Sequence, residues 1–232
     1  MKPFLVDVPV LILFFNRPQQ LSQVFEQVRN ARPSKLFLYQ DGPRSEHDLP
    51  GIKACREVTD QIDWDCEVHR MYQEKNYGCD PSEYISQKWA FSMVDKCIVL
   101  EDDDVPSVSF FTFCKEMLDK YEQDTRITMI AGFNNEEITP DVPYDYFFAS
   151  TFSIWGWASW RRVIDQWDEH YTFLEDKFNM QQLEQLIKER KFRKDFIYMC
   201  HRHKENNKAY YETIFHASML FNSGLAIVPT AT

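Results

Sequence analysis

The sequence predicts an α/β protein in which a mainly parallel sheet is flanked by helices and is followed by a less regular second half. Apolar runs of strand length alternate with segments of helical periodicity up to about residue 135. The first run, residues 8–15, is apolar throughout, as expected for a strand covered on both faces. The chain has 232 residues, 44% of them hydrophobic, which suits one domain with a sizeable core. This β-α-β-α order implies parallel strands joined by right-handed crossovers.

Local patterns predict each element in turn. After the first strand, Pro18 suits the first turn of a helix, in which apolar residues recur at helical spacing from Leu21 to Val28. Further strands are expected at residues 35–40, 66–72, 97–100 and 127–130, and further helices at residues 52–62, 82–94 and 110–121. The second half is expected to hold a strand at 146–152, a tryptophan-rich stretch, one or two charged helices in 179–205, a helix at 210–221 and a strand at 224–229.

Charge and cysteine content exclude some classes of function. The net charge of −10 and the pI of about 5.1 argue against a nucleic-acid partner, because non-specific binding of nucleic acid relies on basic patches. None of the six cysteines forms a Cys-x-x-Cys pair, and Cys97 and Cys114 lie in an apolar strand and a helix. We therefore expect reduced cysteines and a cytoplasmic protein. Residues 8–15 are too short to span a bilayer and lack the features of a signal peptide.

The acidic run Glu101-Asp102-Asp103-Asp104 directly follows an apolar strand. Four adjacent carboxylates repel one another, so the arrangement is costly unless a positive charge lies among them. A divalent cation is the usual solution, because hard cations bind carboxylate oxygens. The ligand crevice of an open α/β sheet lies beyond the carboxyl ends of its strands, where this run is expected. The run therefore predicts a metal site that holds a phosphorylated ligand, and the alternative is a solvated acidic turn.

Polar residues also follow two other predicted strands. Asn16-Arg17 comes after the first strand and Asp41-Gly42 after the second. Because the carboxyl ends of parallel strands meet at one edge of a sheet, Arg17 is expected beside a phosphate and Asp41 beside a base or ribose. Lys75 and Asn76 lie in a polar turn before the next helix, where Lys75 could meet phosphate and Asn76 with Gly78 could shape a loop near the nucleotide. Each of these segments alone is also compatible with an ordinary turn.

Together these residues resemble glycosyltransferases of the GT-A fold, and most closely the N-acetylglucosaminyltransferase I type with its bacterial relatives. The resemblance spans roughly residues 8 to 216. It rests on the order and spacing of short motifs: Asn16-Arg17, Asp41, Glu101-Asp102-Asp103, Phe110-Phe111, Ala131-Gly132-Phe133-Asn134-Asn135 and Thr151-Phe152-Ser153-Ile154-Trp155-Gly156-Trp157. It implies a single Rossmann-like GT-A domain over residues 1–232, with a nucleotide-sugar-binding half at about 1–135 and an acceptor-side half at about 136–232.

The resemblance implies an inverting transferase that uses a nucleotide-diphosphate sugar, a UDP-sugar by preference, together with Mn²⁺ or Mg²⁺. Asp103 would bind the metal directly. Glu101 and Asp102 would contact the ribose, or the metal through water. The other residues expected at the nucleotide are Asn16, Arg17, Asp41 as the reader of the base, Lys75 and Asn76.

The reaction also needs a general base to deprotonate the acceptor hydroxyl. Glu212, after Tyr210-Tyr211, stands where the family has an acidic residue, although the family prefers aspartate and one alignment places Thr213 there. The alternative is a glutamate favoured by the dipole at a helix start. Trp155 and Trp157 are expected to line the site of a glycan or lipid-linked acceptor, their alternative role being in the core.

Several alternatives stay open at this point. Residues 188–204 hold seven Lys or Arg against two acidic residues, which suits either an anionic membrane surface or a solvated helix face. A nucleotidyltransferase is the second enzyme class, although it would normally have a glycine-rich loop after the first strand. A non-catalytic domain that binds nucleotide sugars or carbohydrate is the third. Because a domain seldom ends directly after a core strand, we also expect residues that complete the site to follow Thr232.

Overall fold

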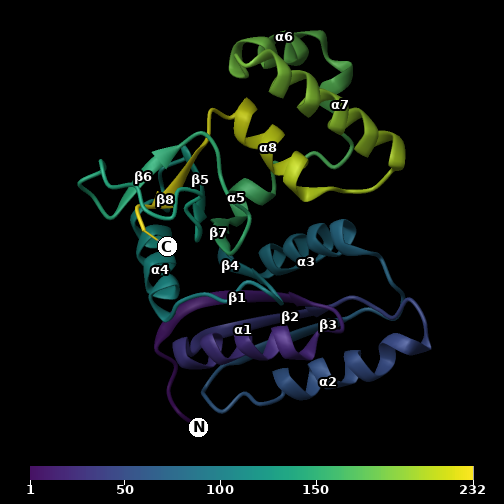
Figure 1. The fold of residues 1–232 in the computed structure, drawn as a ribbon, viewed down its shortest axis with the longest axis vertical. Helices are drawn as coiled ribbons and strands as arrows, with labels where there is room; N and C mark the ends of the chain where they lie inside the picture. Colours follow the sequence, from purple (N-terminus) through teal and green to yellow (C-terminus); the bar gives the residue numbers. More distant parts are fainter. Residues whose placement is uncertain (232) are drawn as a thin grey trace.

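The computed structural model describes residues 1–231 and contains one mostly parallel, mixed sheet flanked by helices (Figure 1). Within these residues the sheet has eight strands in the order β3-β2-β1-β4-β7-β5-β8-β6. The strands are β1 Val6–Phe14, β2 Pro33–Gln40, β3 Glu67–Tyr72, β4 Lys96–Glu101, β5 Ile127–Ala131, β6 Tyr146–Ala149, β7 Trp157–Trp160 and β8 Leu225–Pro229. The α-helices are α1 Pro18–Ala31, α2 Leu49–Thr59, α3 Cys79–Met93, α4 Val108–Lys120, α5 Arg161–Ile164, α6 Lys177–Leu186, α7 Arg190–Asn206 and α8 Tyr211–Phe221.

The first half has the predicted alternation of strands and helices. Strand β1 pairs in parallel with β2 and β4, and β2 pairs in parallel with β3. Helix α1 begins at Pro18, and the predicted apolar face from Leu21 to Val28 is buried against the sheet. In Figure 1, α1 and α2 lie on one side of β1–β3 and α3 lies on the other. Strand β1, in the interior of the sheet, is therefore covered on both faces, which explains its continuous apolar run.

The register of the parallel strands fixes the position of the site. Phe14 pairs with Gln40, and Leu13 pairs with Glu101, so β1, β2 and β4 end side by side. The residues that follow these ends are therefore brought to one edge of the sheet. This confirms the convergence that the sequence predicted for the three segments.

The second half contains a strand that was not predicted. Residues 157–160 form β7, which lies antiparallel between β4 and β5, and all four residues are buried. Its four residues are too short to show a clear period, and the aromatic side chains were interpreted as part of an acceptor-side loop. Strand β8 pairs in parallel with β5 and antiparallel with β6, so this half of the sheet is mixed.

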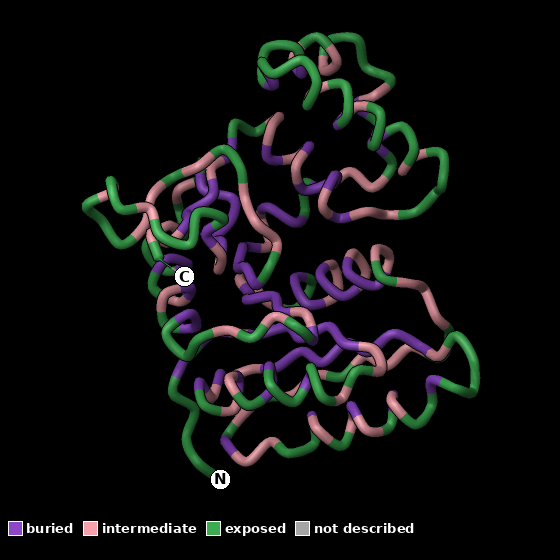
Figure 2. The backbone as a smooth tube through the Cα atoms, in the orientation of Figure 1, coloured by how far each residue is buried: buried purple, intermediate pink, exposed green. Residues whose placement is uncertain are grey.

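The charged segment predicted as one or two helices forms two, α6 and α7, which lie at the opposite end of the molecule from α1 and α2 (Figure 1). Helix α8 packs Tyr211 and Phe215 against Trp157 of β7. Figure 2 shows that the backbone of α6 and α7 is mostly exposed or intermediate, whereas the buried backbone follows the central strands. All six cysteines are free, and Cys97 and Cys114 are buried. In residues 1–231, we find no helix with the length and apolar character needed to cross a bilayer.

Candidate functional site

A cavity of about 440 Å³ opens where β1, β2 and β4 end. Its volume lies in the range of small-molecule binding sites. Its polar lining residues come from the ends of these strands, the following loops and the first turns of α3: Asn16, Arg17, Tyr39, Asp41, Arg44, Asn76, Ser82, Glu83, Glu101 and Asp102. A second cavity of about 660 Å³ lies across the acidic turn and is lined by Asp103, Asp104, Phe110, Phe133 and Trp155, among others.

Two hydroxyl groups at the wall of the first cavity lie near each other, and the first also lies near Gln73, but within residues 1–231 neither makes a hydrogen bond of normal geometry. They are the phenol of Tyr39, which is 1% exposed, and the hydroxyl of Ser82, which is 6% exposed. Most buried polar atoms in proteins are paired, because leaving them unpaired costs free energy. The two hydroxyls therefore indicate a polar ligand in this cavity.

The acidic turn is partly neutralised by the protein itself. The guanidinium of Arg17 donates two hydrogen bonds to Asp102, and its Nη1 lies 2.9 Å from a carboxylate oxygen of Asp103. Asp102 is buried, whereas Asp103 is half exposed. Arg17 lines the first cavity as predicted, but its charge is directed at these two carboxylates. The positive charge expected among the carboxylates is thus supplied, for two of the four, by Arg17.

Asp104 has a structural role in the turn. Its Oδ2 accepts hydrogen bonds from the backbone N–H groups of Glu101 at 3.1 Å and Gly156 at 2.9 Å. Gly156 has a φ of +64°, a left-handed conformation that glycine adopts without strain. Asp104 therefore ties the end of β4 to the segment that enters β7.

Burial changes the acidity of the turn. It raises the pKa of Glu101 to about 7, with a further contribution from the charges of Asp104, Asp103, Asp102 and Glu212. It also raises the pKa of Asp104 to about 6 and raises the pKa of Asp102 in spite of Arg17. Glu101 is therefore partly protonated near neutral pH, and an added cation would favour its ionised form.

The predicted role of Asp41 as reader of the base is not what the structure shows. Its buried carboxylate accepts hydrogen bonds from the backbone N–H groups of Gly42, Tyr77 and Gly78 and from the side-chain amide of Asn76, all at about 3 Å. These donors occupy the acceptor capacity of both oxygens. Asp41 lines the cavity, but it holds the 76–78 loop in place instead of offering an acceptor to a base.

Asn76 shapes a loop at the cavity as expected, whereas Lys75 lies away from the cavity. The amide of Asn76 also donates to the carbonyl oxygen of Gly42 at 2.8 Å, so it joins two loops at the edge of the cavity. Lys75 places its ammonium 4.7 Å from the centre of the Tyr77 ring and is not among the residues that line the cavity. The prediction that Lys75 contacts the nucleotide is therefore not supported by its position.

Asn16 lies at the cavity and belongs to a network that the sequence did not reveal. Its amide donates to Asp48 at 2.6 Å, and Asp48 also pairs with the guanidinium of Arg44. The Arg44 guanidinium holds the pKa of Asp48 down at about 2. Arg44 is largely exposed and lines the cavity, so it is a second cationic side chain there beside Arg17.

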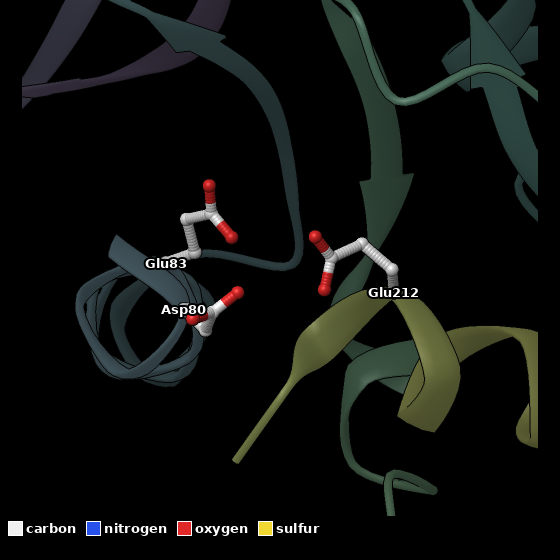
Figure 3. A group of neighbouring side chains, drawn as sticks. All are labelled: Asp80, Glu83 and Glu212. Carbon is white, nitrogen blue, oxygen red and sulfur yellow. The ribbon is translucent and has the colours of Figure 1, made fainter. Parts of the chain in front are cut away.

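Glu212 lies at the start of α8 and faces Asp80 and Glu83 on α3 (Figure 3). One carboxylate oxygen of each residue lies within 4.8 Å of the others. Burial raises the pKa of Glu212, and burial with nearby negative charge raises the pKa of Glu83 to about 8. Thr213, the other candidate for the base, is buried and hydrogen-bonded to Tyr171 and His203, so Glu212 is the residue that faces the carboxylates.

The two tryptophans predicted to line the acceptor site lie in different environments. Trp155 is 58% exposed, lines the second cavity and packs edge-on against Phe133. Trp157 is 1% exposed and stacks in the core between Phe91 and Tyr211. The prediction that Trp157 contacts an acceptor is therefore wrong, because β7 is an interior strand with both faces covered.

The structure thus brings Asn16, Arg17, Asp41, Asn76, Glu101 and Asp102 to one cavity and places Asp103 and Trp155 at the next. The sequence missed Tyr39, Arg44, Ser82 and the pair Asp80 and Glu83. The only local signal for that pair was an acidic Asp-Pro-Ser-Glu run at a helix start.

In comparisons with known proteins, no family model and no curated protein matches this chain. Its function is therefore argued from these residues.

Proposed function

We propose that this protein is a metal-dependent, inverting glycosyltransferase of the GT-A type. It would move a sugar from a nucleotide-diphosphate donor, preferably a UDP-sugar, to a hydroxyl group of a glycan or lipid-linked acceptor. The observation that carries the proposal is the first cavity, which combines two buried hydroxyls without regular hydrogen bonds, an exposed arginine and an acidic turn at the ends of three parallel strands. This is where open α/β sheets bind nucleotides.

The first cavity suits the nucleoside and diphosphate. The hydroxyls of Tyr39 and Ser82 provide hydrogen-bonding partners for a base or ribose inside the cavity. Arg44 uses Nε and Nη2 in its pair with Asp48, and its exposed Nη1 provides a donor for an oxygen of the diphosphate. Arg17 adds positive charge beside the acidic turn, although two carboxylates already share it.

The residues of the acidic turn also fit a divalent cation. Asp103 is half exposed and uses only Oδ2 in its ion pair with Arg17, which leaves Oδ1 available. Glu101 adds a second carboxylate at the first cavity. Mg²⁺ and similar cations are commonly held by one or two carboxylates, substrate phosphates and water. When bound, such a cation stabilises the negative charge of the departing diphosphate.

The acceptor side is supported by Glu212 and Trp155. A carboxylate whose pKa is raised by burial is suited to accept the proton of an acceptor hydroxyl, because its pKa moves toward the working pH. Trp155 offers an exposed indole face for a sugar ring at the second cavity. The acceptor oxygen would attack from the face opposite the departing diphosphate, which inverts the configuration of the transferred sugar.

Thermal unfolding with a panel of nucleoside diphosphates, with and without Mn²⁺, tests the donor site. A ligand at about 100 times its dissociation constant stabilises the folded state by roughly 2.7 kcal/mol. We expect one nucleotide to stabilise the protein in a metal-dependent way, Tyr39→Phe to weaken its binding, and Asp103→Asn to abolish the metal dependence. Asp119→Asn, which changes an exposed carboxylate on α4, is the matched control.

Nucleotide sugars of the same base then test turnover by release of nucleoside diphosphate. Turnover that is lost in Glu212→Gln while nucleotide binding persists supports the assigned base. Binding without turnover on any sugar or acceptor would favour the non-catalytic alternative. No stabilisation by any nucleotide, or equal stabilisation in Asp103→Asn, would overturn the proposed donor site.

A further inference from the structure

Asp80, Glu83 and Glu212 form a group of carboxylates that is separate from the acidic turn. Asp80 and Glu83 project from the first turns of α3, and Glu212 projects from the first turn of α8. Figure 3 shows the three side chains directed toward one another across the space between these helices. One oxygen of each lies within 4.8 Å of the other two, a spacing that allows all three to contact one ion.

Glu83 provides an independent indication of a ligand. Its side chain is directed into the group, the residue is 6% exposed, and its Oε2 has no hydrogen-bond partner. The other oxygen, Oε1, has only the weak donor Sγ of Cys79, at 3.3 Å. A buried carboxylate oxygen without a partner is costly, because the interior does not replace its lost hydration.

The protein supplies no adequate counter-charge to this group. Within residues 1–231, no lysine, arginine or histidine forms an ion pair with Asp80, Glu83 or Glu212. The charge of Asp80 acts on His203, but burial lowers the pKa of that imidazole, which favours its neutral form. The amino ends of α3 and α8 favour negative charge, yet such interactions with a helix end are weak. Burying carboxylates without a partner costs several times more.

We propose that Asp80, Glu83 and Glu212 form a second divalent-cation site, which binds a hard cation of the Mn²⁺, Mg²⁺ or Ca²⁺ class in the absence of nucleotide. Each side chain supplies carboxylate oxygen, the ligand type that these cations prefer, and water completes the coordination. The site differs from the proposed donor cation at Asp103, which depends on diphosphate oxygens. A cation here joins α3 of the first half to α8 of the second.

The site has a consequence for catalysis that rests on the proposed function. Glu212 cannot accept a proton from an acceptor while its carboxylate neutralises a cation. Transfer activity is therefore expected to rise with cation concentration as the donor site fills and to fall as this second site fills.

Titration of the full chain with Mn²⁺ alone, followed by the electron paramagnetic resonance signal of free Mn²⁺, tests the site without nucleotide. We expect the wild-type protein to bind Mn²⁺, and Glu83→Gln and Asp80→Asn each to weaken this binding at least tenfold. Asp103→Asn is the matched control and is expected to leave it unchanged. Circular dichroism establishes that each variant is folded. Glu83→Gln and Asp80→Asn change side-chain charge with little change of shape.

The outcomes separate this proposal from the proposed function. Absence of Mn²⁺ binding without nucleotide, unchanged binding in Glu83→Gln, or loss of binding in Asp103→Asn would each overturn the second site. If no nucleotide binds but Mn²⁺ binds to wild type and not to Glu83→Gln, the second site stands and the donor site fails. If the nucleotide binds with Mn²⁺ and the wild type binds no Mn²⁺ alone, the donor site stands and the second site fails.

Discussion

The molecule contains two groups of carboxylates that are similar in charge and differ in how that charge is balanced. In the acidic turn, Arg17 pairs with Asp102 and Asp103, and backbone N–H groups bind Asp104. In the group of Asp80, Glu83 and Glu212, no basic side chain among residues 1–231 forms an ion pair, and Glu83 has a buried oxygen without a partner among these residues. The negative charge of the first group is largely balanced by partners within the fold. The negative charge of the second group can be balanced only by bound protons or by a cation.

This difference shows that an acidic run in a sequence does not by itself identify the place that most needs a cation. The run of four carboxylates is conspicuous, but the fold supplies an arginine from 85 residues away. The second group is spread over two helices and has no comparable partner. The contrast makes four predictions, given from the largest expected effect to the smallest.

Arg17→Met removes the positive charge from the acidic turn and leaves the Asp102 carboxylate buried without a partner. We expect the free energy of unfolding to fall by about 3 kcal/mol, at the lower end of the range for broken buried pairs, because Arg17 is itself half exposed. Urea denaturation measures the loss. Combining Arg17→Met with Asp102→Asn should restore part of the stability, and a double variant as unstable as the single one would contradict the assigned pairing.

Glu83→Gln removes the buried charge of the second group. The pKa of Glu83 is about 8 in the folded protein, against an ordinary value of 4.5, so the folded state binds the extra proton between these pH values. The free energy of unfolding must therefore fall as pH rises through this window. In buffer with a chelator we expect the variant to match wild type near pH 4.5 and to be more stable by about 2 kcal/mol at pH 6, because each pH unit within this window changes the difference by about 1.4 kcal/mol. A stability difference that does not change with pH would rule out a raised pKa at Glu83.

Asp104→Ala removes the acceptor for the N–H groups of Glu101 and Gly156. We expect a loss of about 1–2 kcal/mol, because two backbone donors lose their partner. Thermal or urea unfolding measures this loss. Asp104→Asn keeps an acceptor oxygen, so its free energy of unfolding should be closer to that of the wild type. Equal losses of stability in the two variants would argue against the role of Asp104 as acceptor for these N–H groups.

Asp103→Asn is expected to change stability least. Its ion pair with Arg17 is half exposed, and such pairs contribute about 0.2–1 kcal/mol. Its proposed contribution is to the donor cation, so nucleotide-dependent Mn²⁺ affinity should fall at least tenfold while the urea midpoint barely moves. A large loss of stability in Asp103→Asn would place this residue with Asp102 among the structural carboxylates.

Local sequence patterns were sufficient for most elements of the fold. The continuous apolar run before Asn16 and the helical spacing after Pro18 correspond to β1 and α1. The four residues of β7 were missed because a short aromatic segment has no distinctive period, and its place between β4 and β5 depends on pairing with strands distant in sequence. The prediction for Trp157 was wrong for the same reason, because its burial follows from the place of β7 in the sheet.

The candidate site shows the same division between local and long-range information. Asn16, Arg17 and Glu101 to Asp104 were predicted at one edge of the sheet because they directly follow parallel strands, and the register confirms this. Their partners were not predictable in the same way. The bonds of Asp41 to the 76–78 loop join segments that are distant in the chain.

By itself, the sequence determined an α/β sheet whose strands end in polar residues, because strand and helix periodicity and the residues that terminate strands are local properties. Only the tertiary structure decided which charges are neutralised and which are not. It placed Arg17 on the acidic turn and moved Glu212 beside Asp80 and Glu83, about 130 residues earlier in the chain. The physical reason is that electrostatic interactions and desolvation depend on distance and burial in the folded chain, and neither is written in the order of the residues.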